Sequence, residues 1–115
     1  MKFTNIRAHE SFAVLSNVNE TGKLGFVIAK NARKIRDELI EYETKINEIV
    51  SKYGTPRDDG FFEVKPEDVQ AYLAERKEYD DVECDIPVLT VDEDTFCSGN
   101  LTSQQMYVLD WMVDT

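Results

Sequence analysis

Residues 28–53 read IAKNARKIRDELIEYETKINEIVSKY, and this stretch decides the fold. Its apolar and aromatic side chains recur at alternating spacings of four and three residues, which is the a/d pattern of a heptad repeat. Gly54 follows directly and favours a helix end, and Pro56 prevents the helix from resuming. The pattern predicts one continuous helix from about residue 24 to 53, with a length of about 45 Å. The stripe consists of Ile28, Ala32, Ile35, Leu39, Tyr42, Ile46, Ile49 and Tyr53.

The apolar stripe of this helix has to be covered, and two arrangements satisfy that requirement. In the first, the stripe packs against other helices of the same chain, because a small domain must bury such a face. In the second, two copies pair through the stripe as a homodimeric coiled coil. Tyr42 and Tyr53 would make a wider and less regular seam than Leu or Ile, which favours packing within the chain.

The segments on either side of the long helix are shorter. Helical periodicity predicts helices over about residues 7–18, 66–79 and 103–113, and β-type patterns predict strands over 61–65 and 82–88 that pair with each other. Thr102 and Gln105 carry the signature of a capping box at the start of the last helix. Residues 90–100 are turn-rich, and we expect them to be irregular. We therefore expect a single α+β domain, 1–115, that is mainly helical, with an all-α bundle as the alternative.

Composition and charge restrict the partners. The chain has 115 residues, with 23 acidic against 13 basic side chains and a formal net charge of −10. Such a charge repels a phosphate backbone or an anionic membrane, so we expect neither direct nucleic-acid binding nor membrane binding. There is no apolar run of about 18 residues, and charges interrupt the amino-terminal segment MKFTNIRAHESF where a signal peptide is apolar. These features predict a cytoplasmic protein.

The acidic residues are concentrated in one part of the chain. Residues 58–94 contain fourteen acids and three cations, whereas residues 23–36 hold five cations and no acid. One interpretation is a solvated surface that also pairs with the basic start of the long helix. The other is a negative patch offered to a basic partner by charge complementarity. In that case the candidate partner-binding residues are Asp80, Asp81, Glu83, Asp85, Asp92, Glu93 and Asp94.

Patterns of catalytic or metal-binding residues are weak. The only histidine is His9, and the glycines Gly22 and Gly25 match a phosphate-binding loop poorly. Cys84 and Cys97 are far from His9 in the sequence, and the acidic run 92–94 lacks the ligand spacing of a calcium loop. We therefore predict no catalytic, cofactor-binding or metal-binding residue, no cofactor, and two free thiols.

Three stretches of the chain carry a family resemblance. They are IAKNARKI at 28–35 continuing to KYG at 52–54, then VECDIPVL at 82–89, and LTSQQM at 101–106 continuing to Val113. In this order, and over a little more than half of the chain, they resemble a group of short uncharacterised proteins encoded by phages and prophages of Gram-positive bacteria. The resemblance implies a viral accessory or assembly protein without known catalytic residues, so it transfers no site residue.

Two functions follow as hypotheses. The first is a non-enzymatic acidic phage protein that works in the host cell by binding and modulating or inhibiting a host protein. A nucleic-acid-handling defence enzyme is the expected target, as for an anti-CRISPR-like inhibitor, because acids can replace phosphates in a basic groove. The alternative is a virion-assembly protein, such as a tail or head chaperone or scaffold, that acts through its heptad helix. Both hypotheses require another protein as partner.

Overall fold

The structure is a computed structural model that describes residues 1–114. Within this range the chain is mainly helical with four short strands, which confirms the α+β class. The α-helices are α1 (Asn5–Ser16), α2 (Gly22–Glu38), α3 (Ile40–Tyr53), α4 (Val69–Asp80), α5 (Glu93–Cys97) and α6 (Ser103–Val108). The strands are β1 (Lys2–Thr4), β2 (Gly54–Pro56), β3 (Phe62–Val64) and β4 (Glu83–Asp85), and two 3₁₀ helices are η1 (Pro66–Asp68) and η2 (Asp110–Met112).

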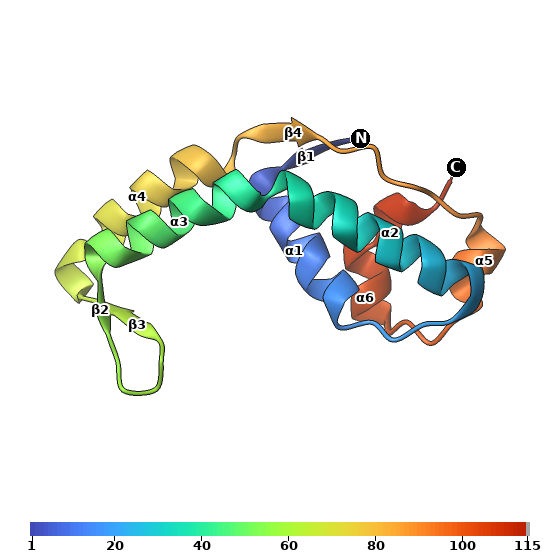
Figure 1. The fold of residues 1–115 in the computed structure, drawn as a ribbon, viewed down its shortest axis with the longest axis horizontal. Coiled ribbons are helices and arrows are strands. Elements are labelled where there is room, and N and C mark those ends of the chain that lie inside the picture. Colours follow the sequence, from blue (N-terminus) through green and yellow to red (C-terminus); the bar gives the residue numbers. More distant parts are fainter. Residues whose placement is uncertain (115) are drawn as a thin grey trace.

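The heptad-patterned stretch forms two helices, so the prediction of one continuous helix over 24–53 is wrong. α2 and α3 meet at Leu39, whose ψ is 2°. The Leu39 N–H is shared between the carbonyls of Ile35 and Arg36, at 3.0 and 3.2 Å, and the backbone bends there without glycine or proline. Figure 1 shows the two helices meeting at an angle near the centre of the molecule. The bend allows one stripe to face two different sets of partners.

The stripe itself packs within the chain, as the first of the two arrangements required. Before the bend, Ile28 and Ile35 belong to the main core, and Leu39 at the bend is fully buried there. After the bend, Ile49 is buried and Tyr53 is half-buried, with the Tyr53 ring 6.2 Å from the Tyr72 ring of α4. The apolar face predicted for a two-copy coiled coil is therefore covered by the chain's own elements.

The strands exist where the pattern placed them, but they pair differently. β3 pairs with β2 in a local antiparallel hairpin, and β4 pairs antiparallel with β1 at the amino terminus. The expected pairing of 61–65 with 82–88 is therefore wrong. The segment Gly54–Pro56 was expected only to end the helix, and Lys2–Thr4 shows no strand pattern of its own. A local turn at 57–61 brings β2 and β3 together more easily than a distant strand can.

Most buried side chains lie in one part of the molecule, here called the body, which consists of β1, α1, α2, β4, α5, α6 and η2. Figure 1 shows these elements gathered around α1 and α6. The Phe3 and Trp111 rings meet edge to face at 5.2 Å, which ties the amino-terminal strand to the carboxyl-terminal turn. Leu109 and Met112 are fully buried beside them. The two ends of the chain thus close one core.

The second part of the molecule, here called the arm, consists of α3, β2, β3, η1 and α4. In Figure 1 it projects from the body as a helical hairpin with the β2–β3 turn at its far end. Within residues 43–85 only Ile49 is buried. The apolar residues Val69 and Leu73 of α4 are 37% and 55% exposed. The arm is therefore a thin structure with almost no core of its own.

Two sets of polar contacts link distant segments of the body. One joins α2 to the segment after β4, and the other joins α1 to η2. The side chain of Asn31 is fully buried, donates to the Leu89 carbonyl at 2.9 Å and accepts from the Leu89 N–H at 2.8 Å. The Trp111 indole N–H donates to the buried Ser11 hydroxyl at 3.1 Å. Because buried polar groups need partners, these bonds fix the register of α2 and α1 against distant segments.

The carboxyl-terminal part follows the prediction only in outline. The capping box of Thr102 and Gln105 is present, with both hydrogen bonds formed. The helix expected over 103–113 ends early, because α6 stops at Val108 and the chain continues as η2. The stretch 90–100, expected to be irregular, contains the short helix α5. Both thiols are free, as predicted, with Cys84 half-buried and Cys97 exposed.

Candidate protein-binding surface

The seven predicted binding acids fall in two separate places. Residues 80–85 lie at the end of α4 and along β4, where the arm joins the body. Residues 92–94 lie at the start of α5, which Figure 1 shows at the far end of the body from the arm. The seven acids therefore do not form one continuous patch, and each group has to be assessed separately.

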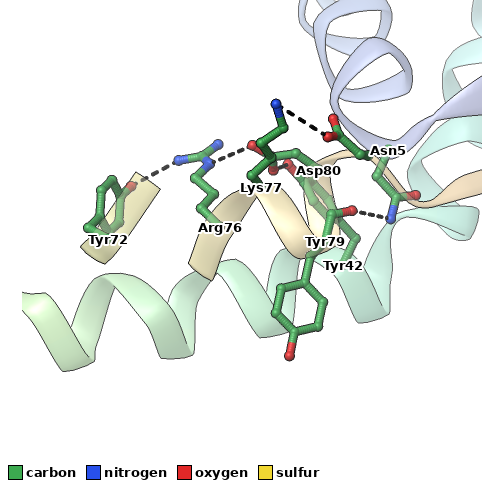
Figure 2. A network of polar contacts seen from close by, with 8 residues as sticks. Asn5, Tyr42, Tyr72, Arg76, Lys77, Tyr79 and Asp80 are labelled. Atoms are coloured by element: carbon green, nitrogen blue, oxygen red, sulfur yellow. Dashed lines mark hydrogen bonds and ion pairs between the residues drawn. The ribbon is translucent and has the colours of Figure 1, made fainter. Parts of the chain in front are cut away.

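Asp80 is a structural residue. Its carboxylate accepts a short hydrogen bond from the Tyr42 hydroxyl of α3 and pairs with the Arg76 Nε at 3.3 Å (Figure 2). Arg76 also donates to the Tyr72 hydroxyl at 3.0 Å. Burial, together with the hydrogen bond to Asp80, raises the pKa of Tyr42 to about 12. The Asp80 carboxylate is thus occupied by contacts with side chains of the same protein.

Asp85 and Asp92 also have local partners. The amino-terminal ammonium of Met1 donates to the Asp85 carboxylate at 2.8 Å, and this bond lowers the pKa of Asp85. Asp92 caps α5 by accepting from the Thr95 N–H at 2.7 Å, and bonds with Thr95 lower the pKa of Asp92. Both carboxylates remain exposed, but contacts within the chain partly compensate their negative charges.

The other predicted acids are more available. Asp81, which directly follows α4, lies 3.9 Å from the Lys77 ammonium at an exposed site where such a pair is weak. Glu83, Glu93 and Asp94 are exposed and form no ion pair with any other residue of the range 1–114. The group near β4 borders a cavity that Glu83 helps to line.

A hollow of about 410 Å³, here called the acidic hollow, lies where α2, α3, α4 and β4 meet. Its lining consists of Asn5, Glu38, Glu41, Tyr42, Lys45, Tyr79, Val82, Glu83 and Cys84. The bend at Leu39 places Glu38 and Glu41 on either side of the helix junction, and β4 contributes Glu83. The hollow thus combines three carboxylates with aromatic, aliphatic and thiol walls.

The carboxylates of the acidic hollow have little compensation. Its one cation, Lys45, pairs with Glu48 on its own helix at 3.4 Å, and its pKa is raised first by that contact. Glu38, Glu41 and Glu83 make no ion pair within residues 1–114. The five cations of residues 23–36 form no ion pair with the acids of 58–94 in the same range. No ion pair therefore links the basic helix start to this acidic stretch among the described residues, although Lys23 adds to the lowering of the Asp92 pKa that the Thr95 bonds chiefly cause.

Sequence reasoning missed Glu38 and Glu41. They lie outside the acid-rich stretch 58–94, and only the fold brings them beside Glu83. A signal was present, because residues three apart occupy neighbouring positions on a helix surface. The count of acids per segment did not use that spacing.

Cys84 is a further titratable group in the lining of the hollow. Burial raises the pKa of the Cys84 thiol, which disfavours the nucleophilic thiolate. Within residues 1–114, no group of three His, Cys, Asp or Glu side chains is placed to hold a metal ion. In that same range, no helix combines the length and the apolar character required to cross a membrane.

Comparisons with known proteins add no family. No protein-family model matches the chain, and no curated protein or solved structure is significantly similar to it.

Proposed function

We propose that this chain is a non-catalytic protein that binds a basic surface of another protein through the acidic hollow. The observation that carries the proposal is the set of three glutamates, Glu38, Glu41 and Glu83, around one hollow without an ion pair among residues 1–114. Three carboxylates gathered around one hollow give it a local negative charge. Cationic side chains of a partner are complementary to such a surface.

The walls of the hollow favour lysine or arginine over a bare metal ion. Tyr79 and Val82 offer apolar surface for the methylene stem of a long cationic side chain, whose charged end then reaches the carboxylates. Arginine in particular makes paired hydrogen bonds with carboxylates. A nucleic acid or an anionic membrane is disfavoured by the net charge of −10.

The sequence resemblance to phage and prophage proteins suggests what the partner is. On that basis the chain is an accessory protein that acts in the cytoplasm of the infected host and modulates or inhibits a host protein. A nucleic-acid-handling defence enzyme fits, because its phosphate-binding groove is basic and the acids of the hollow mimic phosphates there.

A second candidate function is virion assembly, as a tail or head chaperone or scaffold. The heptad stripe does not support it, because that stripe packs within the chain. The arm does, because Phe61, Phe62 and Leu73 are 70%, 46% and 55% exposed on a part with almost no core. Exposed apolar side chains on such a projection are typical of contacts with another protein.

Affinity capture with matched charge variants tests the first proposal. One variant carries Glu38→Gln, Glu41→Gln and Glu83→Gln, and the control carries Glu10→Gln, Glu63→Gln and Glu67→Gln. The six residues are exposed, and both variants change the net charge equally. We expect wild type and control to retain the same basic host protein and the hollow variant to lose it. Equal retention by both variants would reject the acidic hollow as the binding surface.

A further inference from the structure

The strand β4 has one edge paired with β1 and one edge open, and the hydrogen-bond pattern identifies the groups on the open edge. The Ile86 N–H donates to the Met1 carbonyl at 2.9 Å, and the Met1 ammonium donates back to the Ile86 carbonyl at 3.0 Å. At the other end, the Asn5 N–H donates to the Val82 carbonyl at 2.9 Å. Residues 82, 84 and 86 are therefore those that bond to the amino-terminal strand.

In an antiparallel pair, successive residues alternate between bonding to the neighbour and pointing away from it. Since Val82 and Ile86 bond inward, the backbone N–H and C=O groups of Glu83 and Asp85 point outward. No loop or side-chain group within residues 1–114 bonds to their amides. Figure 1 shows β4 along the upper rim of the molecule, with β1 on its inner side. An edge of this kind is a template for another strand.

The side chains on β4 determine which strand fits. Glu83 and Asp85 share one face of the strand and are exposed, whereas Cys84 is half-buried on the opposite face. A second copy of this chain would bring the same acids opposite one another, and like charges directly opposite are destabilising. An extended segment with Lys or Arg at alternate positions places each cation opposite an acid instead.

The acidic hollow continues this surface. Val82, Glu83 and Cys84 of the β4 region also line the hollow, so a strand added to the open edge runs beside it. Its backbone hydrogen bonds supply affinity, and alternate side chains supply specificity. Pro87, two residues beyond Asp85, lacks an N–H and limits the edge to a short segment.

From this geometry we propose that the partner contributes an extended basic segment that adds as a strand to the open edge of β4, bonding to the backbone of Glu83 and Asp85. The proposal rests on the proposed function, because it specifies how the basic partner binds. It also makes a distinct claim, since it requires backbone pairing in addition to charge attraction.

The test uses a capped eight-residue peptide of alternating lysine and threonine, with isotope-labelled full-length protein. In antiparallel addition the lysines lie opposite Glu83 and Asp85 and bond with them directly, so lysine N–H groups point toward β4. A peptide N-methylated on its lysines loses those donors, whereas one N-methylated on its threonines retains them. All three peptides carry the same charge.

We expect the parent and threonine-methylated peptides to slow amide exchange of Glu83 and Asp85 by about tenfold or more, and the lysine-methylated peptide to leave it unchanged. If all three peptides bind alike and none slows these amides, the edge proposal is overturned while the acidic binding surface stands. If none binds even at low salt, both proposals fail.

A variant of the protein gives a second test. Asp85→Pro removes one outward N–H while Cys84 before it keeps the strand conformation that proline requires. Asp85→Asn keeps this N–H, removes the charge and with it the ion pair to Met1, and retains an oxygen that can accept from the Met1 ammonium. We expect the proline variant to bind the parent peptide about tenfold more weakly than the asparagine variant. Equal affinity would overturn the proposal. If the proline variant does not fold, the methylated peptides on wild type decide the question.

Discussion

The body and the arm are built from the same kind of amphipathic helix, yet they are stabilised differently. The body closes an apolar core in which Ile35, Leu39 and Leu109 are fully buried. Among its described residues the arm buries only Tyr42, at its junction with the body, and Ile49. Its helices are held together by aromatic and charged contacts, such as Tyr53 with Tyr72 and Lys52 with Glu75. Burial of apolar surface makes the largest favourable contribution to folding, so the body carries most of the stability.

The difference shows that a heptad stripe does not determine what covers it. The same repeat contacts the main core as far as Tyr42 and Ile46, and only its end, at Tyr53, packs on the mostly polar helix α4. A helical hairpin with little buried area opens locally at a lower free energy than a core does. The acidic hollow lies at the junction, so its shape depends on how firmly the arm is held to the body.

The largest expected effect comes from removing core volume at the bend. Leu39→Ala leaves a cavity at a fully buried position and should lower the free energy of unfolding by about 2–5 kcal/mol. Urea denaturation followed by circular dichroism measures this loss. Replacing the half-buried Ile46 of the arm with Ala should lower the free energy of unfolding by a smaller amount. An equal loss at both positions would contradict the division into body and arm.

Ile49→Ala separates the two parts more directly. Because Ile49 is the one buried side chain within residues 43–85, its truncation should accelerate hydrogen exchange in α3 and α4. Exchange in α2 and in the buried parts of α1 should remain slow. Uniform acceleration across both parts would mean that arm and body unfold as one unit.

Asn31→Ala removes the two hydrogen bonds that join α2 to the backbone of Leu89 after β4. Both backbone groups of Leu89 lose their partner, and the free energy of unfolding should fall by about 1–3 kcal/mol. Amide exchange of Leu89 should quicken. Ser16→Ala, which removes a hydroxyl bonded within the exposed end of α1, is a control and should change stability little.

Thr102→Ala tests the start of α6. The Gln105 N–H loses its acceptor, and we expect a cost of about 0.5–2 kcal/mol with faster exchange at Gln105. Thermal unfolding and amide exchange together measure the effect. Unchanged exchange in the first turn of α6 would show that the capping box does not stabilise this helix in solution.

The smallest effect concerns the hydrogen bond between Tyr42 of α3 and Asp80 of α4, within the arm, and it depends on pH. The pKa of Tyr42 is raised to about 12, so the folded state holds the phenol proton more tightly than the unfolded state does. The stability from this group is therefore full below about pH 10, the unfolded pKa, and is lost as pH rises toward 12. Tyr42→Phe should be about 0.5–1.5 kcal/mol less stable at pH 8, with the difference closing above pH 10.

Tyr107→Phe is the matched control for this titration, because Tyr107 is 82% exposed. Its stability should follow wild type at every pH. A gap between Tyr42→Phe and wild type that stays constant from pH 8 to 12 would contradict the raised pKa of Tyr42.

The sequence predicted local features well and their assembly poorly. Periodicity located the helical segments other than α5, although it joined α2 and α3, and Thr102 with Gln105 located a cap. These signals depend on residues a few positions apart. The bend at Leu39 was not predictable, since no glycine or proline marks it. It reflects which segments pack on either side, and tertiary packing overrides helix propensity there.

The sequence identified only some residues of the candidate site, because the site is also assembled by contacts between distant segments. Counting acids found Asp81 and Glu83, but it could not show that Asp80 bonds to Tyr42 or that Asp85 pairs with the amino terminus. These contacts join residues far apart in the chain. Glu38 and Glu41 became candidates only when the bend placed them beside β4.

The association rate with the captured basic partner, measured as a function of salt concentration, tests the central claim most directly. Charge complementarity acts mainly on encounter and is screened by salt. The variant Glu38→Gln, Glu41→Gln, Glu83→Gln should associate more slowly at low salt and depend less on salt than wild type. The control Glu10→Gln, Glu63→Gln, Glu67→Gln should retain most of the wild-type rate and salt dependence. Identical rates and salt slopes for the two variants would contradict the claim that the acidic hollow binds the partner.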